Sequence, residues 1–556
     1  MMIKKTLLIL LTAFGTITFS QENCVYLESD IYPGSPGGLP VAMAEYNGAL
    51  YFRATGNAQG AELWKYENGT TSMVADINPG AGSSLVNNLT VFQGDLYFTA
   101  ANSTVGMELF KYDGVSVTNA ADIFPGVGGS QPSMLTVVGS NLYFTATDGT
   151  SGQEPWKFDG VTATQLGDIN PGSGGSNANS YAGFGGNVFF TAFDPTIGFE
   201  LFKYDGAIVT TYDLYPGVMS SNVGEITDIG SKVIFRATNG TQGYELWEHD
   251  GTTATCLDLC TVGPGDFTPW ELTKWNGEVF FRGFITGPGY ELWKHDGTVA
   301  TQVADINSGG DGYPNNFAGG TSILYFAANN GTSGNELFMY DGSSVSLCGD
   351  LNPGSNNSMP TGWTEKIVIV GNNAFFIGDD GSTGNEVYTY DGSSVYVGKD
   401  IVSGSQSSSA SGLTPFNGDL YFMADDQVAG GELWVWKPDA DLNSSITVVT
   451  CSSYTSPGGI FYGQEGHYTF TDIIPSVACP GCDSIIDIDL TISSLEDSLI
   501  VATCDDYISP AGQFFNSPGN YVFTDTVSSL VCSGADSILH IDLTILTNLN
   551  LNIFAI

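Results

Sequence analysis

Residues 94–114 read GDLYFTAANSTVGMELFKYDG, and two positions in this stretch decide the fold. The first is Phe98, the third residue of LYF. The second is Glu108, which follows ten residues later and stands two residues after Gly106. Both recur along the chain at the same offsets, and a fixed period of this kind indicates a repeat architecture. The recurring residues are Phe52, Phe98, Phe144, Phe190, Phe235, Phe281, Phe326, Phe376 and Phe422, with Glu62, Glu108, Glu154, Glu200, Glu245, Glu291, Glu336, Glu386 and Glu432.

Each repeat is expected to form four short antiparallel strands. LTVFQGDLYFTA, residues 89–100, predicts two strands joined by a turn at Gly94. GMELFKYDG adds a third strand whose Asp-Gly ending is a strong hairpin signal. A fourth strand ends in the DINPG motif at Asp76, because Pro and Gly interrupt strands. Four strands in about 46 residues correspond to one β-propeller blade, so the sequence predicts an all-β propeller over residues 24–438.

The repeat is cut between its third and fourth strands. Asp30 follows CVYLES with no Glu-bearing strand before it, and GELWVWKPD, residues 431–439, has no fourth strand after it. We therefore predict that residues 25–30 complete the last blade and close the ring through backbone hydrogen bonds. The Asp that ends the fourth strand recurs at Asp30, Asp76, Asp122, Asp168, Asp213, Asp258, Asp305, Asp350 and Asp400.

Nine repeats in one ring exceed the usual four to eight blades. One ring of nine is the expectation, and two smaller propellers or an eight-bladed ring with one aberrant unit are the alternatives. The unit between Asp350 and Asp400 is one irregular unit, because a spacing of 50 residues before Glu386 replaces the usual 45 or 46. The loop TVGPGDFTPW, residues 261–270, marks a second irregular unit.

Residues 1–20 have the pattern of a signal peptide. Lys4 and Lys5 precede a short apolar run, Leu7 to Phe14, and Ser20 is small enough to precede cleavage. The run is too short to span a bilayer, so no transmembrane segment is expected. The 15 basic and 59 acidic residues give a net charge of −44, which disfavours nucleic acid as a partner. A secreted or cell-surface location is expected.

Two small β modules follow the repeats, at residues 446–493 and 499–546. One begins CSSYTSPGG at Cys451 and the other CDDYISPAG at Cys504. In both modules a second cysteine lies 28 residues after the first, so we predict one disulfide in each, worth about 2–4 kcal/mol. Cys482 has no counterpart in the second module, and its pairing with Cys451 is an alternative. The predicted pairs are Cys451 with Cys479 and Cys504 with Cys532.

The other cysteines and two of the histidines are weak candidates for metal ligands. Cys256 and Cys260 have a ligand-like spacing but no second pair nearby. A disulfide between them, or a bond to Cys348 or Cys24, is an equally good interpretation. His249 and His295 replace the repeated tyrosine and are expected to be packing variants. No cofactor is expected, with calcium held by loop carboxylates as the alternative.

The candidate contact residues fall into two sets. The nine repeated Glu residues are expected to be structural, accepting hydrogen bonds from turn amides or pairing with a neighbouring blade. Three tryptophans outside the repeated ELW position are expected to contact a ligand: Trp270, Trp275 and Trp363. The sequence contains no GxSxG, HExxH or phosphate-binding motif. A glycosidase that uses two paired carboxylates stays open.

The strings GAELWKYENGT (60–70), GYELWEHDGT (243–252) and GYELWKHDGT (289–298) resemble the bacterial repeat family named for its ELWxxDGT signature. The resemblance covers residues 24–438 and implies an exported propeller without implying a ligand. EPWKFDG at Glu154 and EVYTYDG at Glu386 depart from the signature. The C-terminal modules resemble a Cys-bearing repeat of Bacteroidetes surface proteins, which implies a Gram-negative cell surface and type IX secretion.

These observations lead to three expectations about function. The first is a binding or adhesion scaffold without catalytic activity, whose partner is a surface glycan or protein. The second is an extracellular glycan-active enzyme, a hydrolase or lyase, which requires a non-repeated cluster of acids, His or Tyr at one end of the ring. The third is a structural surface or matrix protein.

Overall fold

The computed structural model describes residues 24–546 except 35, 258–266, 361–364, 439–442, 451–452, 465, 476–482, 493–495, 504 and 529–535. The described residues form strands and turns, and none of them is helical. The chain divides into two compact units, of which the larger spans Asn23–Asp439 and the other contains the residues from Ala440 onward. The all-β class predicted from the sequence is confirmed.

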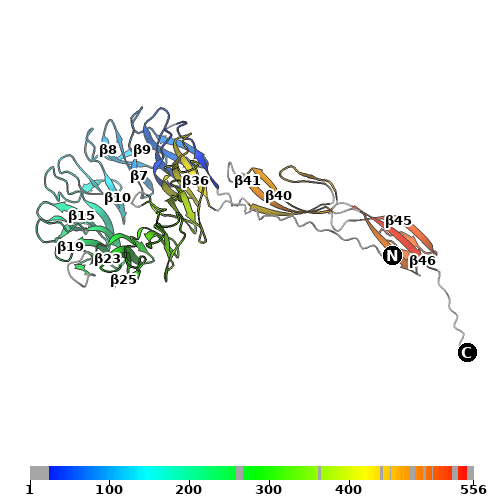
Figure 1. Cartoon of the computed structure of the whole chain (residues 1–556). Helices are drawn as coiled ribbons and strands as arrows, with labels where there is room; N and C mark the ends of the chain where they lie inside the picture. Colours follow the sequence, from blue (N-terminus) through cyan, green and yellow to red (C-terminus); the bar gives the residue numbers. More distant parts are fainter. Residues whose placement is uncertain are drawn as a thin grey trace. The chain divides into compact units, whose positions relative to one another are not determined.

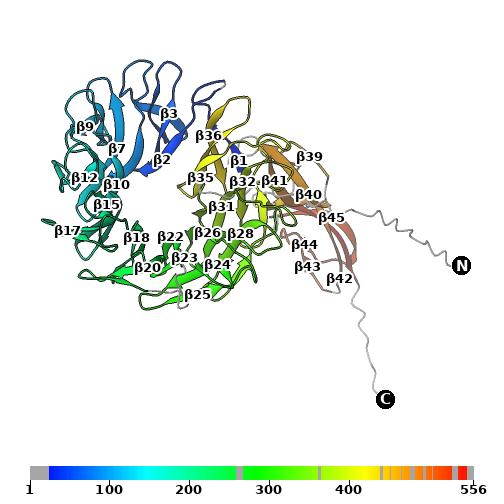
Figure 2. The same cartoon turned by 60° about the vertical axis from the view of Figure 1, so that its left-hand side comes forward.

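The larger unit consists of nine four-stranded antiparallel sheets, numbered here as blades 1 to 9 in chain order. Each blade runs from its first strand at the centre of the ring to its last strand at the periphery (Figure 2). Blades 1 to 3 are β2 (Val41–Tyr46), β3 (Ala49–Thr55), β4 (Ala61–Glu67), β5 (Thr70–Ala75); β6 (Asn87–Phe92), β7 (Asp95–Asn102), β8 (Gly106–Tyr112), β9 (Val117–Ala121); β10 (Ser133–Val138), β11 (Asn141–Ala146), β12 (Glu154–Phe158) and β13 (Ala163–Gln165).

Blades 4 to 6 follow the same order. They are β14 (Asn179–Phe184), β15 (Asn187–Asp194), β16 (Gly198–Tyr204), β17 (Val209–Tyr212); β18 (Gly224–Asp228), β19 (Val233–Thr238), β20 (Tyr244–His249), β21 (Ala254–Cys256); β22 (Trp270–Trp275), β23 (Glu278–Ile285), β24 (Gly289–His295) and β25 (Ala300–Ala304).

Blades 7 to 9 complete the ring. They are β26 (Asn315–Gly319), β27 (Leu324–Asn329), β28 (Asn335–Tyr340), β29 (Val345–Leu347); β30 (Val368–Val370), β31 (Asn373–Gly378), β32 (Glu386–Tyr390), β33 (Val395–Val397); β34 (Ser411–Phe416), β35 (Asp419–Asp425), β36 (Gly431–Lys437) and β1 (Cys24–Ser29).

The two ends of the propeller meet in blade 9. Strand β1 pairs antiparallel with β36, which places Tyr26 opposite Val435 and Leu27 opposite Trp434. The innermost strands of blades 1 and 9, β2 and β34, are in contact, so the ring is closed (Figure 2). The predicted closure by the N-terminal strand is confirmed. One ring of nine blades replaces the two alternatives, because every repeat supplies a complete sheet.

The hydrophobic core lies between adjacent blades. One cluster joins Tyr51 and Leu63 of blade 1 to Leu96 and Phe98 of blade 2. The repeated phenylalanines Phe52, Phe98 and Phe144 are fully buried in clusters of this kind. Burial of a phenylalanine contributes about 1.5–3 kcal/mol, so one Phe per repeat is a packing requirement of the ring.

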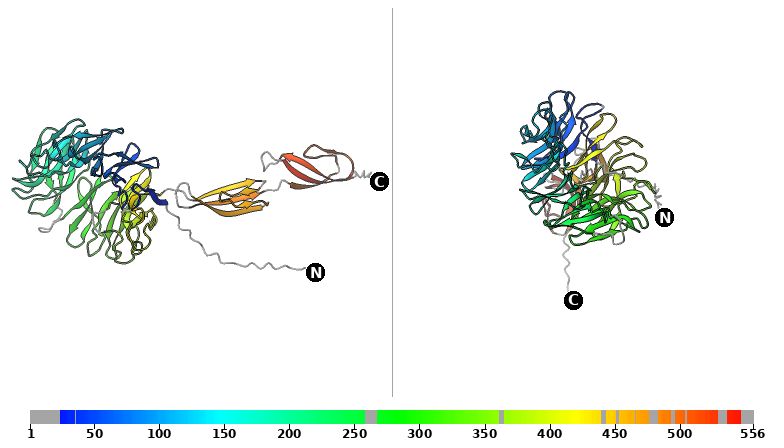
Figure 3. Two further views of the ribbon diagram at one scale, coloured as in Figure 1. Left: turned by 90° about the horizontal axis from the view of Figure 1, so that it is seen from above. Right: turned by 90° about the vertical axis from the view of Figure 1, so that its left-hand side faces the viewer.

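The C-terminal unit contains two modules of the same design (Figures 1 and 3). In each, a three-stranded sheet has one parallel and one antiparallel pairing, and a two-stranded hairpin accompanies it. The predicted disulfide cysteines, together with Cys482, lie outside the described residues. The strands are β37 (Asn443–Thr450), β38 (Tyr454–Thr455), β39 (Phe461–Tyr462), β40 (Gly466–Pro475), β41 (Asp483–Ile492), β42 (Glu496–Thr503), β43 (Tyr507–Ile508), β44 (Phe514–Phe515), β45 (Gly519–Ser528) and β46 (Asp536–Ile545).

Candidate functional site

The repeated glutamates hold the turns of their own blades. Glu108 is fully buried, and its carboxylate accepts hydrogen bonds from the amides of Ile123 (3.1 Å), Phe124 (3.1 Å) and Ser130 (2.8 Å). Burial raises the pKa of Glu108, and these hydrogen bonds oppose the rise. All nine repeated glutamates are fully buried. Buried carboxylates that accept turn amides in this way agree with the structural role expected of the repeated glutamates.

The two repeat histidines are also buried in the structure. His249 and His295 are fully buried, and the Nδ1 atom of each accepts the amide of the glycine two residues later, at 2.9 and 3.0 Å. Burial lowers the pKa of His249 to about 4. A metal site also needs convergent ligands, and no group of three His, Cys, Asp or Glu side chains within the described ranges is arranged to bind an ion.

The described cysteines of the propeller have different environments. Cys24 in β1 is disulfide-bonded. Cys348 is a free thiol whose pKa is raised to about 12 by burial. Cys256 ends β21 and packs at the edge of the core cluster between blades 4 and 5. Cys260 lies outside the described residues, so its predicted bonds stay predictions.

Two of the three candidate tryptophans are described, and they have different roles. Trp275 is only 6% exposed, and its Nε1 donates to the carbonyl of Gly320 at 2.8 Å. It ends an innermost strand, where Tyr46 and Phe92 stand in blades 1 and 2, so it belongs to the interblade core. The expectation that Trp275 contacts a ligand is wrong for this reason. Trp363 lies outside the described residues.

Trp270 lies in a pocket on the wall of the ring. It is partly buried at the start of β22, and the guanidinium carbon of Arg236 lies 3.5 Å from the centre of its ring. The cavity beside it, the wall pocket, has a volume of about 490 Å³ and is lined by Glu225, Trp270, Glu271, Asn316, Glu365 and Lys366, among others. This is the size of a small-molecule site.

Two carboxylates of the wall pocket, Glu225 and Glu271, occupy the same position of the repeat. This position is the second residue of the innermost strand, ten residues before the repeated Phe, and its φ lies between 54° and 60° in the seven blades named here. The strand register shifts at this point, as it does between Gly224 and Thr227, and such a bulge re-aims the side chain. The residues are Ala42, Asn88, Met134, Ser180, Glu225, Glu271 and Asn316.

Among these seven blades, only blades 5 and 6 carry an acidic residue at this position. Blades 1 to 4 carry neutral residues there, whereas blades 5 and 6 carry Glu225 and Glu271, and Glu365 lies just before the innermost strand of blade 8. The sequence alone did not point to Glu225, Glu271 or Glu365 as site residues. Aligning the nine units on the repeated Phe would have revealed the change at this one position for Glu225 and Glu271. Glu365 is displaced by the longer spacing of its unit.

Each of these side chains bridges to the next blade. Glu225 Oε2 accepts the amide of Leu272 at 2.8 Å, and Glu271 Oε2 accepts the amide of Asn316. A third link joins blades 7 and 8, because Asn316 Nδ2 donates to the backbone carbonyl of Glu365 at 2.6 Å. Within the described part of the chain, Oε1 of Glu271 accepts no hydrogen bond. The bridges fix the carboxyl groups rigidly and leave Glu271 with an oxygen for a ligand.

Burial and neighbouring charges act on these carboxyl groups in opposite directions. Burial raises the pKa of Glu225, while the Leu272 amide and the charges of Arg236 and Arg282 lower it. Burial also raises the pKa of Glu271, with the Asn316 amide and Arg282 opposing the rise. The negative charge of Glu225 raises the Glu271 pKa further. Two adjacent acids of unequal surroundings suit proton transfer.

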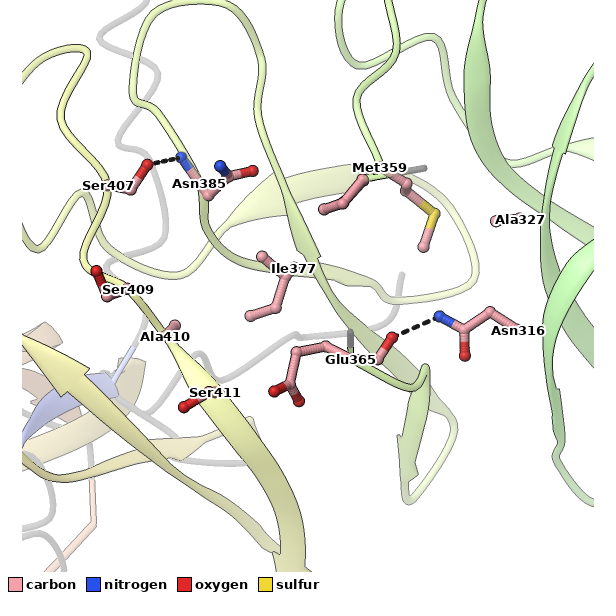
Figure 4. Close-up of a pocket in the computed structure, with 11 residues that line it drawn as sticks. Asn316, Ala327, Met359, Glu365, Ile377, Asn385, Ser407, Ser409, Ala410 and Ser411 are labelled. Carbon is pink, nitrogen blue, oxygen red and sulfur yellow. Dashed lines mark hydrogen bonds between the residues drawn. The ribbon is translucent and has the colours of Figure 1, made fainter. Parts of the chain in front are cut away.

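A second cavity adjoins the wall pocket. This cavity, the notch, has a volume of about 420 Å³ and lies between blades 7, 8 and 9. Asn316 and Glu365 line both cavities. Figure 4 shows Glu365 between Asn316 on one side and Ser411 of β34 on the other. The polar residues that line the notch from blades 8 and 9 are Asn385, Ser407, Ser409 and Ser411.

Comparison with known proteins finds no family and only distant structural matches. No family model and no curated protein matches the chain. Among solved structures, the chain is similar to the β-propeller domain of the Trilobed protease from Pyrococcus furiosus, with 13% identity and a TM-score of 0.31, over 56% of this chain and 97% of that one. It is also similar to a puromycin hydrolase, with 12% identity and a TM-score of 0.34, over 87% of this chain and 64% of that one.

A puromycin-hydrolysing peptidase of Mycobacterium tuberculosis is a further match, with 11% identity and a TM-score of 0.32, over 61% of this chain and 57% of that one. These matches are described as a propeller domain of a protease and as puromycin hydrolases, so they do not support the expectation of a scaffold without catalytic activity. The peptidase substrates are not transferred to this chain.

No described segment forms a helix of the length and hydrophobicity that a membrane span requires.

Proposed function

We propose that the chain is an extracellular glycan-active enzyme, a hydrolase or lyase, whose site is the wall pocket. The observation that supports this most directly is the pair Glu225 and Glu271. Both are non-repeated, partly buried carboxyl groups on adjacent innermost strands. Glycoside cleavage requires two acidic side chains that flank the scissile bond and have different surroundings.

The two carboxyl groups take different roles in this proposal. Glu271 keeps its proton to a higher pH than an ordinary Glu, because burial and the charge of Glu225 raise its pKa. It is the general acid that protonates the leaving-group oxygen. Burial raises the pKa of Glu225 too, and the charges of Arg236 and Arg282 oppose that rise. Glu225 acts as the carboxylate that activates water, attacks the sugar or, in a lyase, removes a proton.

The remaining pocket residues suit a sugar. Trp270 provides an aromatic surface of the kind that sugar rings stack on, and Asn315, Asn316 and Lys366 provide hydrogen-bonding groups beside it. The signal-peptide pattern and the resemblance to the ELWxxDGT repeat family support an exported enzyme. The resemblance of the C-terminal modules to Bacteroidetes surface repeats supports a Gram-negative cell surface. The net charge of −44 argues against nucleic acid as the substrate.

The test is product release from a panel of neutral and acidic polysaccharides by the full chain. Reducing-end formation detects cleavage, and ultraviolet absorption by an unsaturated sugar separates a lyase from a hydrolase. Glu271→Gln should lower kcat about 100-fold or more, because the amide N–H is too weakly acidic to act as a general acid. Glu45→Gln is the matched control, since Glu45 is an exposed acid on the innermost strand of blade 1. An unchanged rate in the Glu271→Gln variant would exclude this site.

A further inference from the structure

The notch lies beside β30, the short innermost strand described in blade 8. β30 has three residues, whereas the innermost strands of the other eight blades have five or six. This unit is the one with the long spacing before Glu386. The notch is lined from β26 on one side of β30 and from β34 on the other.

Met359, upstream of β30, also departs from the repeat. Met359 is 4% exposed and packs with Ile367 and Ala374 in the core between blades 7 and 8. At the same repeat position, Leu85 is 48% exposed and Tyr313 is 47% exposed. The inward turn of Met359 gives the notch an apolar floor, which Ile377 extends. A cavity with an apolar floor and polar walls is typical of a small-ligand site.

We propose that the notch is a second sugar-binding subsite, so that the substrate is an oligosaccharide that spans the notch and the wall pocket. This inference rests on the proposed function. The two cavities meet at Asn316 and Glu365, so a ligand that fills both passes over these residues. Asn316 is fixed there, because its Oδ1 accepts the Ile367 amide at 3.0 Å while its Nδ2 donates to the Glu365 carbonyl.

The lining of the notch indicates a neutral sugar. Besides the carboxylate of Glu365, its polar groups are hydroxyls and amides, from Ser407, Ser409, Ser411, Asn385 and Asn316, and none of its described lining residues is Lys or Arg. Hydroxyls and amides both donate and accept hydrogen bonds, as sugar hydroxyls require. A uronic acid carboxylate would meet Glu365 without a cation to offset it. The wall pocket, which contains Lys366, has no such restriction.

The test is a substitution that fills the notch, with ligand binding measured directly. Ser411 is the first residue of β34, and the same repeat position in blade 6 is Trp270, so this strand position accepts Trp. Ser411→Trp places an indole in the notch. Ser133→Trp makes the same change at the start of β10 in blade 3, away from both cavities, and is the matched control. Both changes are made in the Glu271→Gln chain, so that no substrate is consumed.

The ligands are neutral β-1,4- and β-1,3-linked gluco-oligosaccharides, glucose, and a galacturonate oligomer, with affinity measured by calorimetry. A neutral oligosaccharide should bind the Glu271→Gln chain about tenfold or more tightly than glucose does. Ser411→Trp should remove this gain and leave glucose binding unchanged, while Ser133→Trp should retain it. A gain that survives in Ser411→Trp, equal binding of the galacturonate oligomer, or no gain with length would each overturn the subsite.

These outcomes are separate from failure of the proposed function. Loss of turnover in Glu271→Gln together with an unchanged gain in Ser411→Trp retains the enzyme and rejects the notch. A length-dependent gain that only Ser411→Trp removes, in a chain that cleaves none of the polysaccharides, retains the subsite and rejects the enzyme.

Discussion

The amide of Ile31 donates to Oε2 of Glu432 at 2.8 Å, across 401 residues of sequence. The same carboxylate accepts the amides of Tyr32 and Gly38, at 3.0 and 2.6 Å. In the other blades the repeated Glu binds a turn of its own unit, as Glu62 binds Ile77 and Ser84. Glu432 therefore joins the two ends of the ring through the same contact that each of the other blades makes internally.

Glu432→Ala should destabilise the propeller by about 3 kcal/mol or more, because it leaves buried N–H groups without an acceptor. Urea unfolding followed by tryptophan fluorescence measures this change. Glu45→Ala, at an exposed site on β2, should change the free energy of unfolding by less than about 0.5 kcal/mol. A Glu432→Ala chain as stable as the wild type would show that ring closure does not depend on this carboxylate.

The repeated glutamates should make stability fall as pH rises. Burial raises the pKa of Glu291 and Glu386 to about 7 and that of Glu336 to about 6, from 4.5. The folded chain then holds protons that the unfolded chain has lost, so their contribution is complete below pH 4.5 and disappears as pH rises through 7. The Tm of Glu386→Gln should therefore fall less than that of the wild type between pH 5 and pH 8.

The matched comparison is needed because His249 acts in the opposite direction. Its folded pKa is lowered to about 4, so its contribution declines as pH falls from 6.5 towards 4. His249 is unchanged in Glu386→Gln, and the difference between the two chains isolates the glutamate. Identical pH profiles for the two chains would contradict the raised pKa of Glu386.

Removing Arg282 should raise the pKa values of both site carboxyl groups. Its positive charge lowers the pKa of Glu225 and of Glu271, so Arg282→Met should move both titrations to higher pH. Carboxyl carbon chemical shifts in NMR report the two pKa values without requiring turnover. Arg53→Met is the control, because Arg53 occupies the equivalent place in blade 1, opposite Val41. A shift of the same size in both variants would refute a local effect.

The two tryptophans of β22, Trp270 and Trp275, should respond differently to truncation. Trp270→Ala should weaken oligosaccharide binding about tenfold with little loss of stability, since Trp270 is partly exposed in the wall pocket. Trp275→Ala should lower the free energy of unfolding by about 3–5 kcal/mol, because it leaves a cavity in the core. Calorimetry and urea unfolding on the same two proteins measure both effects, and the reverse pattern would contradict the assignments.

The sequence by itself determined the blades and their closure. Phe98 and Glu108 recur at fixed offsets because every blade must pack the same Phe against its neighbour and satisfy the same turn amides. The break in phase at Asp30 then required the first strand to complete the last blade, and β1 does so opposite β36. These features recur in every repeat, so the period of the sequence is enough to reveal them.

Only the tertiary structure decided which residues form a site. Glu225, Glu271 and Glu365 lie in three different repeats, and it is the curvature of the ring that brings their strands to one wall. Trp270 and Trp275 are five residues apart and equally irregular in sequence, yet a bulge turns one into a pocket while the other fills the core. A repeat pattern records what every blade shares, whereas a site depends on what adjacent blades do not share and on where the ring places it.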